Sequence, residues 1–259
     1  MRATSQSRRS VRAPGLSLES VRLDLADGAA TTVQVARFER ERFDVKVVAI
    51  EPTDTVLRWC AANGAEHAIV GGFYVRPGGP PLGHLWLDGS AHATVPFEAP
   101  WDERRSCLHV EGERISMAPR SELPAEPVGD LLQAGPLLVA GGRSLIRRGE
   151  DVEGFSAGSG QFDSDITDGR YPRAALGICD GELIAIAGEG RADDEAGLSM
   201  GELAEAMVGF GATTAINLDG GGSTSLVVGG VLLNTPREEH RLELVGGRDV
   251  ATALQFVPR

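Results

Sequence analysis

Residues 215–228 read Ala-Ile-Asn-Leu-Asp-Gly-Gly-Gly-Ser-Thr-Ser-Leu-Val-Val, in which two short apolar runs enclose a carboxylate, three glycines and three hydroxyl side chains. Each apolar run has the length of a buried strand, and the glycines between them favour a turn. A simple turn requires one glycine, whereas this stretch has three in a row. The triplet therefore predicts a main chain left bare so that a ligand can approach it, with Asp219 at the end of the first strand.

A helix is expected immediately before this strand, and the same arrangement occurs earlier in the chain. Ser199 and Glu202 form a capping box, and the helix that they open is expected to end at Gly211. Earlier, Thr53 or Asp54 is expected to cap a helix that ends at Gly64, and the apolar run 68–70 then leads to Gly71 and Gly72. Two similar helix–strand units would bring their glycine-rich ends to one cleft, and chance similarity is the alternative.

The remaining pattern is dominated by strands. Residues 16–25, 33–35, 43–47 and 250–257 alternate apolar with polar side chains or form short apolar runs. Asp88-Gly89, Glu111-Gly112 and Asp180-Gly181 separate apolar runs, which favours hairpins with type I′ turns. We predict an α+β fold: a single domain over residues 15–259 with a mixed, largely antiparallel β-sheet and a few packed helices. Residues 1–14 are expected to form a flexible basic tail, and the helix–strand joints before Ala68 and Ala215 to supply local parallel pairing.

Composition excludes several classes of function. The 259-residue chain has a net charge of −12 and no basic stripe, which argues against a nucleic-acid partner. No apolar run approaches the roughly 20 residues of a membrane span. The basic N-terminus has no apolar segment behind it, so a cytoplasmic location is the default expectation. The three cysteines match no metal or disulfide spacing and are expected to be free thiols.

The glycine motif makes a family resemblance specific. Residues 217–224, Asn-Leu-Asp-Gly-Gly-Gly-Ser-Thr, resemble the signature of the phosphodiester glycosidase family. Val70 stands where that family has Asn, Ala174 where it has Thr, and Glu189 where Asp is common. Further segments resemble the family in the expected order, so that the similarity covers roughly residues 40–257: 68–74, 133–139, 172–177, 190–191 and 248–254.

The resemblance implies a hydrolase that cleaves a sugar-1-phosphodiester at the C1–O bond and releases a phosphate monoester. Such a leaving group is already stable as an anion, so the site must mainly stabilise charge on the phosphate and on the sugar. Asp219 is then the catalytic base, nucleophile or metal ligand, and Arg173 is the second catalytic residue. Substrate contacts are expected from the following residues: Gly71, Gly72, Arg191, Asn217, Gly221, Gly222, Ser223 and Thr224.

Each assignment has a structural alternative. Asp219 and the hydroxyl groups of Ser223 and Thr224 are also suited to capping a turn. Arg173 is also compatible with a surface salt bridge, and Arg191 has acidic neighbours at residues 193–195 with which it can pair.

A cofactor is not required by the sequence. Asp163, Asp165 and Asp168 lie in the polar stretch 150–173, but their spacing fails the calcium-loop pattern, so a solvated acidic loop is favoured. The resemblance nevertheless allows a divalent cation, Ca²⁺ or Mg²⁺, without specifying its ligands.

The substrate is expected to be a small-molecule or glycan phosphodiester. Two other functions remain open. Val70 motivates a module that binds a phosphorylated glycan without turnover, and a phosphodiesterase that cleaves the P–O bond is the third reading.

Overall fold

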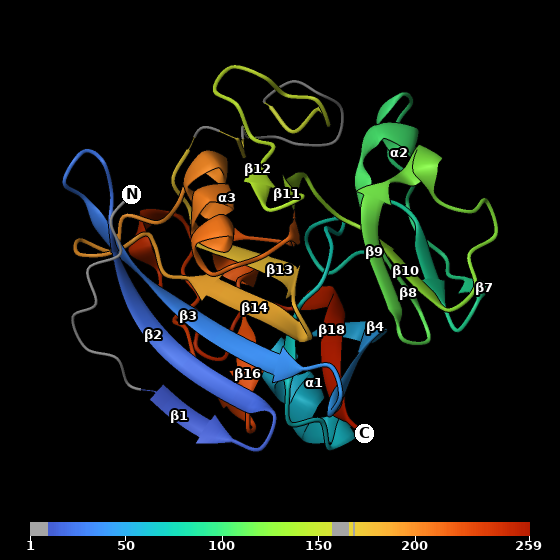
Figure 1. Cartoon of the computed structure of the whole chain (residues 1–259), viewed down its shortest axis with the longest axis horizontal. Helices are drawn as coiled ribbons and strands as arrows, with labels where there is room; N and C mark the ends of the chain where they lie inside the picture. The colour runs from blue at the N-terminus through green and yellow to red at the C-terminus, as the bar shows by residue number, and fades with distance from the viewer. Residues whose placement is uncertain (1–9, 157–165, 168) are drawn as a thin grey trace.

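The computed structural model describes residues 10–156, 166–167 and 169–259, whose strands form one eight-stranded and two five-stranded sheets. Figure 1 shows the eight-stranded sheet beside helix α3, with one five-stranded sheet at the centre and the other in a separate lobe. The helices are α1 (Val56–Asn63), α2 (Trp101–Arg104) and α3 (Met200–Gly209), and the short 3-10 turns are Arg120–Glu122, Gly221–Ser223 and Glu239–Arg241.

The eight-stranded sheet is the platform of the molecule, and its neighbouring strands pair antiparallel. In spatial order its strands are β1 (Ser10–Ala13), β2 (Leu16–Asp24), β3 (Ala30–Glu39), β14 (Glu182–Gly188), β13 (Arg173–Cys179), β15 (Thr214–Asn217), β11 (Leu137–Ala140) and β12 (Arg143–Ser144).

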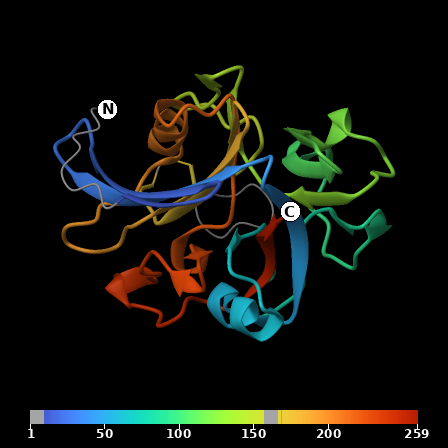
Figure 2. The ribbon, with the colours of Figure 1, turned by 60° about the horizontal axis from the view of Figure 1, so that its bottom comes forward.

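The central five-stranded sheet lies on the other side of this platform from α3, and the sheet of the separate lobe lies to one side of it. Figure 2 shows α3 above the eight-stranded sheet and the central sheet with α1 below it. The central sheet has the order β17 (Val231–Leu232), β16 (Leu226–Val228), β5 (Ala68–Val70), β18 (Val250–Pro258) and β4 (Phe43–Asp54). The sheet of the separate lobe has the order β7 (Ser90–Ala91), β6 (Leu85–Leu87), β10 (Asp130–Gln133), β8 (Ser106–Glu111) and β9 (Arg114–Pro119).

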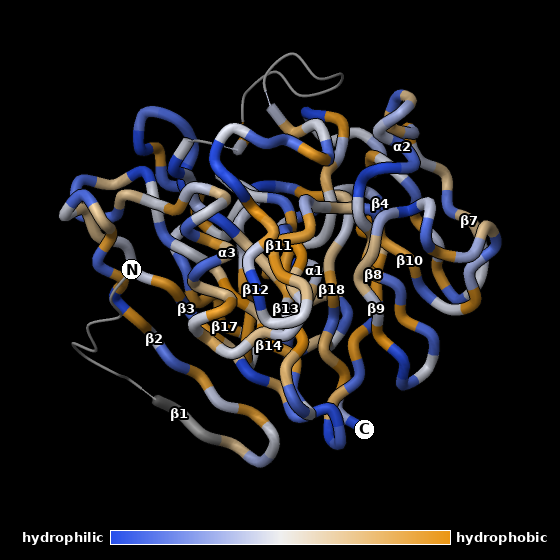
Figure 3. The backbone as a smooth tube through the Cα atoms, turned by 45° about the horizontal axis from the view of Figure 1, so that its top comes forward, coloured by the Kyte–Doolittle hydropathy of each residue, from blue (hydrophilic) through white to orange (hydrophobic). Residues whose placement is uncertain are grey.

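The alternation of side chains along the strands divides the core into two layers. In β14, Leu183 and Ala185 face the central sheet, whereas Ile184 and Ile186 pack in the layer under α3. The hydropathy colouring of Figure 3 places apolar residues mainly along the inner strands and polar residues mainly in the connecting loops. On the central-sheet side, the rings of Phe38 and Phe256 stack with centroids 4.0 Å apart. The end of β15 is therefore packed by both layers, the one under α3 and the one next to the central sheet.

The predicted α+β class is confirmed, and the differences are local. The expected parallel pairing is wrong, because in the described residues β5 belongs to the central sheet and β15 to the eight-stranded sheet, and both pair antiparallel. The expected tail extends too far: residues 10–13 form β1, paired with β2, and residues 1–9 lie outside the described residues.

The local signals at helix ends and turns were only partly predictive. Thr55, and not Thr53 or Asp54, caps α1, whereas the capping box of α3 is present as expected. Both turn residues have positive φ only at Asp88-Gly89, so the type I′ turn is confirmed at that one predicted hairpin. The three cysteines are free thiols. In the described part of the chain, no helix is long and apolar enough to cross a bilayer.

Candidate active site

The chain leaves β15 at Asn217 and is then held by three backbone hydrogen bonds. The N–H groups of Leu218, Asp219 and Gly221 donate to the carbonyls of Ala174, Gly71 and Pro172 at 2.9, 2.9 and 2.8 Å. A Cβ atom at Gly220 would lie 2.9 Å from the Pro172 carbonyl, so no larger residue fits this approach. The Gly221 N–H therefore donates within the protein, although Gly221 itself lines the pocket described below.

Asp219 lines a pocket of about 480 Å³ beside this turn. Its carboxylate accepts hydrogen bonds from the Gly220 N–H at 2.9 Å and from the Ser223 hydroxyl. Burial raises the pKa of Asp219, and the Ser223 hydroxyl and the positive charges of Arg248 and Arg76 oppose this effect. A carboxylate in this setting is partly desolvated and rigidly placed, as a catalytic base or nucleophile requires.

Gly71 and Gly72 support Asp219 from behind and do not line the pocket. Gly71 accepts the Asp219 N–H, and the N–H groups of both glycines donate to Thr252, one to its carbonyl and one to its hydroxyl, each at 3.0 Å. A Cβ atom at Gly71 would lie 2.5 Å from the Thr252 hydroxyl. The two glycine-rich strand ends thus meet, as the repeated helix–strand pattern predicts, but only the later one faces the cavity.

Two arginines are bridged by one carboxylate at the pocket wall. Arg248 pairs with Glu238, and its other terminal nitrogen lies 3.4 Å from the Ser223 hydroxyl. Arg191 lies 3.7 Å from the same carboxylate, and its guanidinium is 5.4 Å from the centroid of the Tyr171 ring. Burial lowers the pKa of Arg191, which stays far above neutrality as an arginine. The expected alternative, pairing of Arg191 with its neighbours at residues 193–195, is not seen among the ion pairs of the described residues.

Gly221 and Gly222 make room for these two side chains. A Cβ atom at Gly221, which has φ +60°, would lie 3.3 Å from the Arg191 guanidinium. One at Gly222 would lie 2.9 Å from the Glu238 carboxylate and 3.0 Å from Arg248. The missing side chains of the triplet therefore let charged groups, and not only the bare main chain, reach the cavity.

Arg173 is 3% exposed and lines the pocket, but its donors serve the surrounding loop. Its Nε donates to the Leu198 carbonyl at 2.9 Å, and one terminal nitrogen donates to the carbonyls of Ile166 and Gly169 at 2.6 and 2.8 Å. These bonds occupy one of the two edges through which a guanidinium can bind a phosphate in bidentate fashion. The geometry gives Arg173 the role of holding Ile166 and Gly169 in place beside the cavity.

The remaining motif residues divide between the cavity and the core. Ser223 contacts Asp219, Arg248 and the hydroxyl of Tyr74, but like Thr224 it is fully buried and outside the pocket lining. Asn217 lines the pocket and donates to the Gly135 carbonyl at 2.8 Å, and its side-chain oxygen has no partner among the described residues. The structure therefore places Asn217 in the pocket lining, gives Ser223 the role of a hydrogen-bond partner of the Asp219 carboxylate, and gives Thr224 a structural place.

Several pocket residues were not assigned from the sequence: Tyr74, Arg76, Tyr171, Glu238, Glu239 and Arg248. Tyr74 lies two residues after the glycine pair, in a segment that resembles the family, and Arg248 begins the last such segment, so the sequence contained a signal for both. Arg76 and the two glutamates come from loops without a pattern. Together the lining carries four guanidinium groups and three carboxylates, so the pocket is locally cationic in an acidic protein.

Val70 does not affect this lining. It is fully buried in β5, where it pairs with Ala253, and it belongs to the core next to the central sheet. Val70 is not among the residues that line the pocket.

No metal site is apparent in the described residues, where no group of three or more His, Cys, Asp or Glu side chains converges. Asp163, Asp165 and Asp168 lie outside the described residues.

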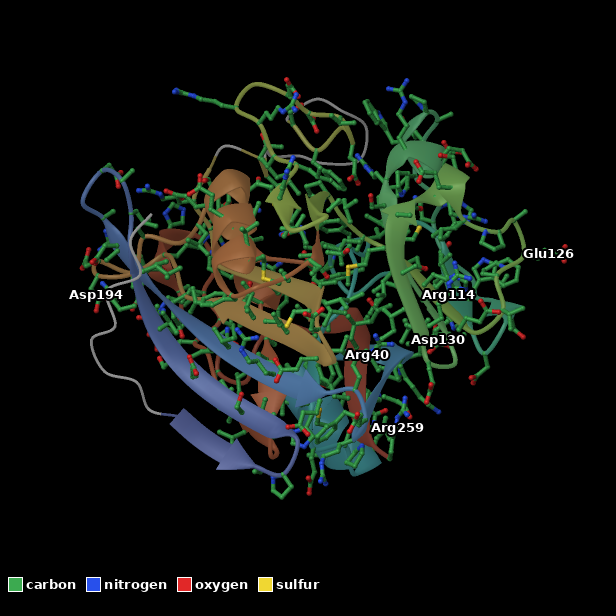
Figure 4. The ribbon with its side chains drawn as sticks, in the orientation of Figure 1. Arg40, Arg114, Glu126, Asp130, Asp194 and Arg259 are labelled. Carbon is green, nitrogen blue, oxygen red and sulfur yellow. The ribbon has the colours of Figure 1, made fainter. Side chains whose placement is uncertain are left out.

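A second cleft, of about 410 Å³, lies where the separate lobe meets β4. Figure 4 labels Asp130 and Arg259 in this region. Asp130 accepts the N–H groups of Val47 and Asp88 at 2.9 Å each, and Arg259 pairs with Asp44 and Glu113 at 2.8 and 2.7 Å. These charges join the lobe to the central sheet, so the cleft is a structural junction.

Comparisons with known proteins agree with the resemblance. No curated protein matches the sequence. The fold is similar to that of the catalytic domain of zebrafish N-acetylglucosamine-1-phosphodiester alpha-N-acetylglucosaminidase, solved in a form auto-inhibited by its pro-peptide: the TM-score is 0.70 at 18% identity, over 100% of this chain and 87% of that one. It is also similar to that of a hypothetical protein from Synechocystis, with a TM-score of 0.68 at 18% identity, where all of this chain spans 65% of the other. The sequence model of the phosphodiester glycosidases matches residues 63–257, which is most of the chain. The chain therefore belongs to the phosphodiester glycosidase family.

Proposed function

We propose that the protein hydrolyses a glycosyl phosphodiester at the C1–O bond and releases the sugar and a phosphate monoester. The observation that carries this proposal is the pairing, in one pocket, of the partly desolvated Asp219 with the guanidinium groups of Arg76, Arg191 and Arg248. The net charge of −12 repels an anionic substrate, so a local cluster of cations is what such a substrate requires. The similar zebrafish enzyme is named for activity on an N-acetylglucosamine-1-phosphodiester, which supports the same reaction class.

The chemistry assigned to the carboxylate is activation of water. Asp219 takes a proton from a water molecule whose oxygen attacks C1, the C1–O bond breaks, and its electron pair leaves with the phosphate monoester. The alternative, direct attack of the Asp219 carboxylate on C1, would give a covalent intermediate and retain the anomeric configuration. NMR of the first sugar product distinguishes the two, because attack by water inverts the configuration at C1 and attack by the carboxylate retains it.

The arginines stabilise the departing phosphate. Arg248 and Arg191 are already oriented by Glu238 before a ligand binds, so their geometry needs little rearrangement. Arg76 is exposed on the loop after Tyr74 and reaches the same cavity, where it is suited to meet the incoming charge. Tyr74 is hydrogen-bonded to Ser223 and Arg248, which connects this loop to the part of the site that contains Asp219.

The test is hydrolysis of N-acetylglucosamine-1-phosphate methyl diester in ¹⁸O-water, with the products examined by mass spectrometry. Label in the sugar is the expected result and means C–O cleavage. Label in the phosphate would instead mean a phosphodiesterase that breaks the P–O bond. A ligand-induced thermal shift without any product would reject the hydrolase and favour a module that only binds the glycan phosphate.

A further inference from the structure

The pocket has an apolar side as well as a charged one. Phe73, Leu82, Val95 and Ile166 line it, and these side chains belong to one hydrophobic cluster. Val75 lines the same cavity and is 37% exposed, so its side chain is accessible to a ligand. We call these five residues the apolar wall. The guanidinium groups of Arg191 and Arg248 lie elsewhere, against Gly221 and Gly222.

The backbone of the apolar wall is well fixed. The Leu82 N–H donates to the Phe73 carbonyl at 2.8 Å, and Leu82 forms a bridge with Val95. The Val75 N–H donates to the Pro80 carbonyl at 2.9 Å, which closes the loop that carries the exposed valine. The wall therefore exists before a ligand arrives, and ordering it costs little on binding.

An aromatic cluster supports the wall from behind. Phe97 and Phe155 pack against it, and the fully buried Arg105 lies between their rings at 4.2 and 4.4 Å from the centroids. Arg105 donates to the carbonyls of Glu153 and Gly154 at 3.2 and 2.5 Å, which fixes this cluster to the chain that precedes Ile166. Because the support is packed and hydrogen-bonded, the wall is not free to collapse into the cavity.

A sugar ring is a poor occupant for this wall. Each buried hydroxyl without a partner carries a desolvation penalty, and the five side chains of the wall offer carbon only. Polar partners for the sugar are available from other lining residues of the same cavity, which include Asp219, Tyr171, Asn217 and Glu239. The apolar wall is thus available to the alcohol that forms the second ester of the phosphate.

We propose that the alcohol esterified to the phosphate is apolar, an alkyl or aryl group that packs on Phe73, Val75, Leu82, Val95 and Ile166 while the phosphate binds the arginines. This inference rests on the proposed function and narrows its substrate class to amphiphilic glycosyl phosphodiesters. Each methylene buried on the wall raises kcat/KM roughly fourfold, from the usual hydrophobic contribution of a CH₂ group.

The experiment compares the methyl, butyl and hexyl diesters of one glycosyl phosphate, because simple alkyl groups leave the reactivity of the phosphate almost unchanged. We expect kcat/KM to rise at least tenfold from methyl to butyl, and the rise to shrink in Val75→Ser and Val95→Ser. Val128→Ser, at a side chain that is 65% exposed and outside the pocket lining, should leave the series as it is in the wild type.

The outcomes separate this inference from the proposed function. Turnover of all three esters at similar kcat/KM overturns the apolar substrate and leaves the hydrolase standing. If no ester is turned over, the hydrolase is rejected. Calorimetry with methyl and hexyl phosphate then tests whether the apolar wall binds an alkyl group: tighter binding of hexyl phosphate supports the inference, and equal affinity overturns it.

Discussion

Gly222→Ala is expected to disturb the charged side of the pocket while leaving the fold intact. The new Cβ would lie 2.9 Å from the Glu238 carboxylate, about half an ångström inside ordinary contact distance, and 3.0 Å from Arg248. Both neighbours are the ends of flexible side chains, and Gly222 is not in the left-handed region. The methyl group should therefore push the Glu238–Arg248 pair aside at a cost to folding below about 1 kcal/mol.

The main expected effect of Gly222→Ala is a lower affinity for phosphate. A hydrogen bond to a charged group contributes about 1.5–3 kcal/mol, and its partial loss at Arg248 should weaken phosphate binding roughly 5- to 30-fold. Calorimetry with inorganic phosphate and the KM for a glycosyl phosphodiester measure this effect, and thermal unfolding should shift by no more than about 4 °C.

Gly209→Ala is the matched control. Gly209 ends α3, has no atom within 4 Å of a built Cβ and is not in the left-handed region, so the same change there should leave phosphate affinity unaltered. If Gly222→Ala binds phosphate as tightly as the wild type, the Glu238–Arg248 pair is not part of the anion site.

Three further changes test the carboxylate and the fold. Asp219→Asn should lower kcat at least about 100-fold with the circular dichroism spectrum unchanged, and wild-type turnover would remove Asp219 from the mechanism. Burial raises the pKa of Asp219, so the folded protein binds its proton more tightly than the unfolded chain does; Asp219→Asn should then raise the Tm at pH 7, and this gain should vanish below about pH 4. Phe38→Ala removes a ring stacked on Phe256 and should cost about 3–5 kcal/mol in urea unfolding; a loss below about 1 kcal/mol would contradict the packing. Ser199→Ala removes the capping box of α3 and should lower the Tm by about 2–4 °C, and an unchanged Tm would show that the cap is dispensable.

The sequence predicts the elements well where a local rule governs them. The alternation before residue 48, the capping box at Ser199 and the glycine-ended strands correspond to β2–β4, α3, β5 and β15. The sequence does not predict which strands pair with one another in a sheet. Nothing within residues 68–70 or 215–218 distinguishes a shared parallel sheet from two antiparallel ones, because that choice is made by the distant partners β18 and β13.

The candidate site shows the same limit. Asp219 was assigned correctly to the cavity, whereas Ser223 and Thr224 of the same motif are fully buried outside its lining. Arg173 lines the cavity, but its Nε donates to a backbone carbonyl. Residue type alone predicts that an arginine can bind phosphate, and only the tertiary structure decides what its donors reach. Glu238 and Arg76 come from irregular loops, which leave no periodicity to read.

The hydrogen bond from the Asp219 N–H to the Gly71 carbonyl crosses a seam between two sheets. Asp219 follows β15 of the large sheet, whereas Tyr74 and Arg248 flank β5 and β18 of the central one. Reacting groups that are misplaced by about an ångström can lose two orders of magnitude in rate. Sub-denaturing urea that loosens this seam should therefore abolish turnover before the tryptophan fluorescence reports unfolding.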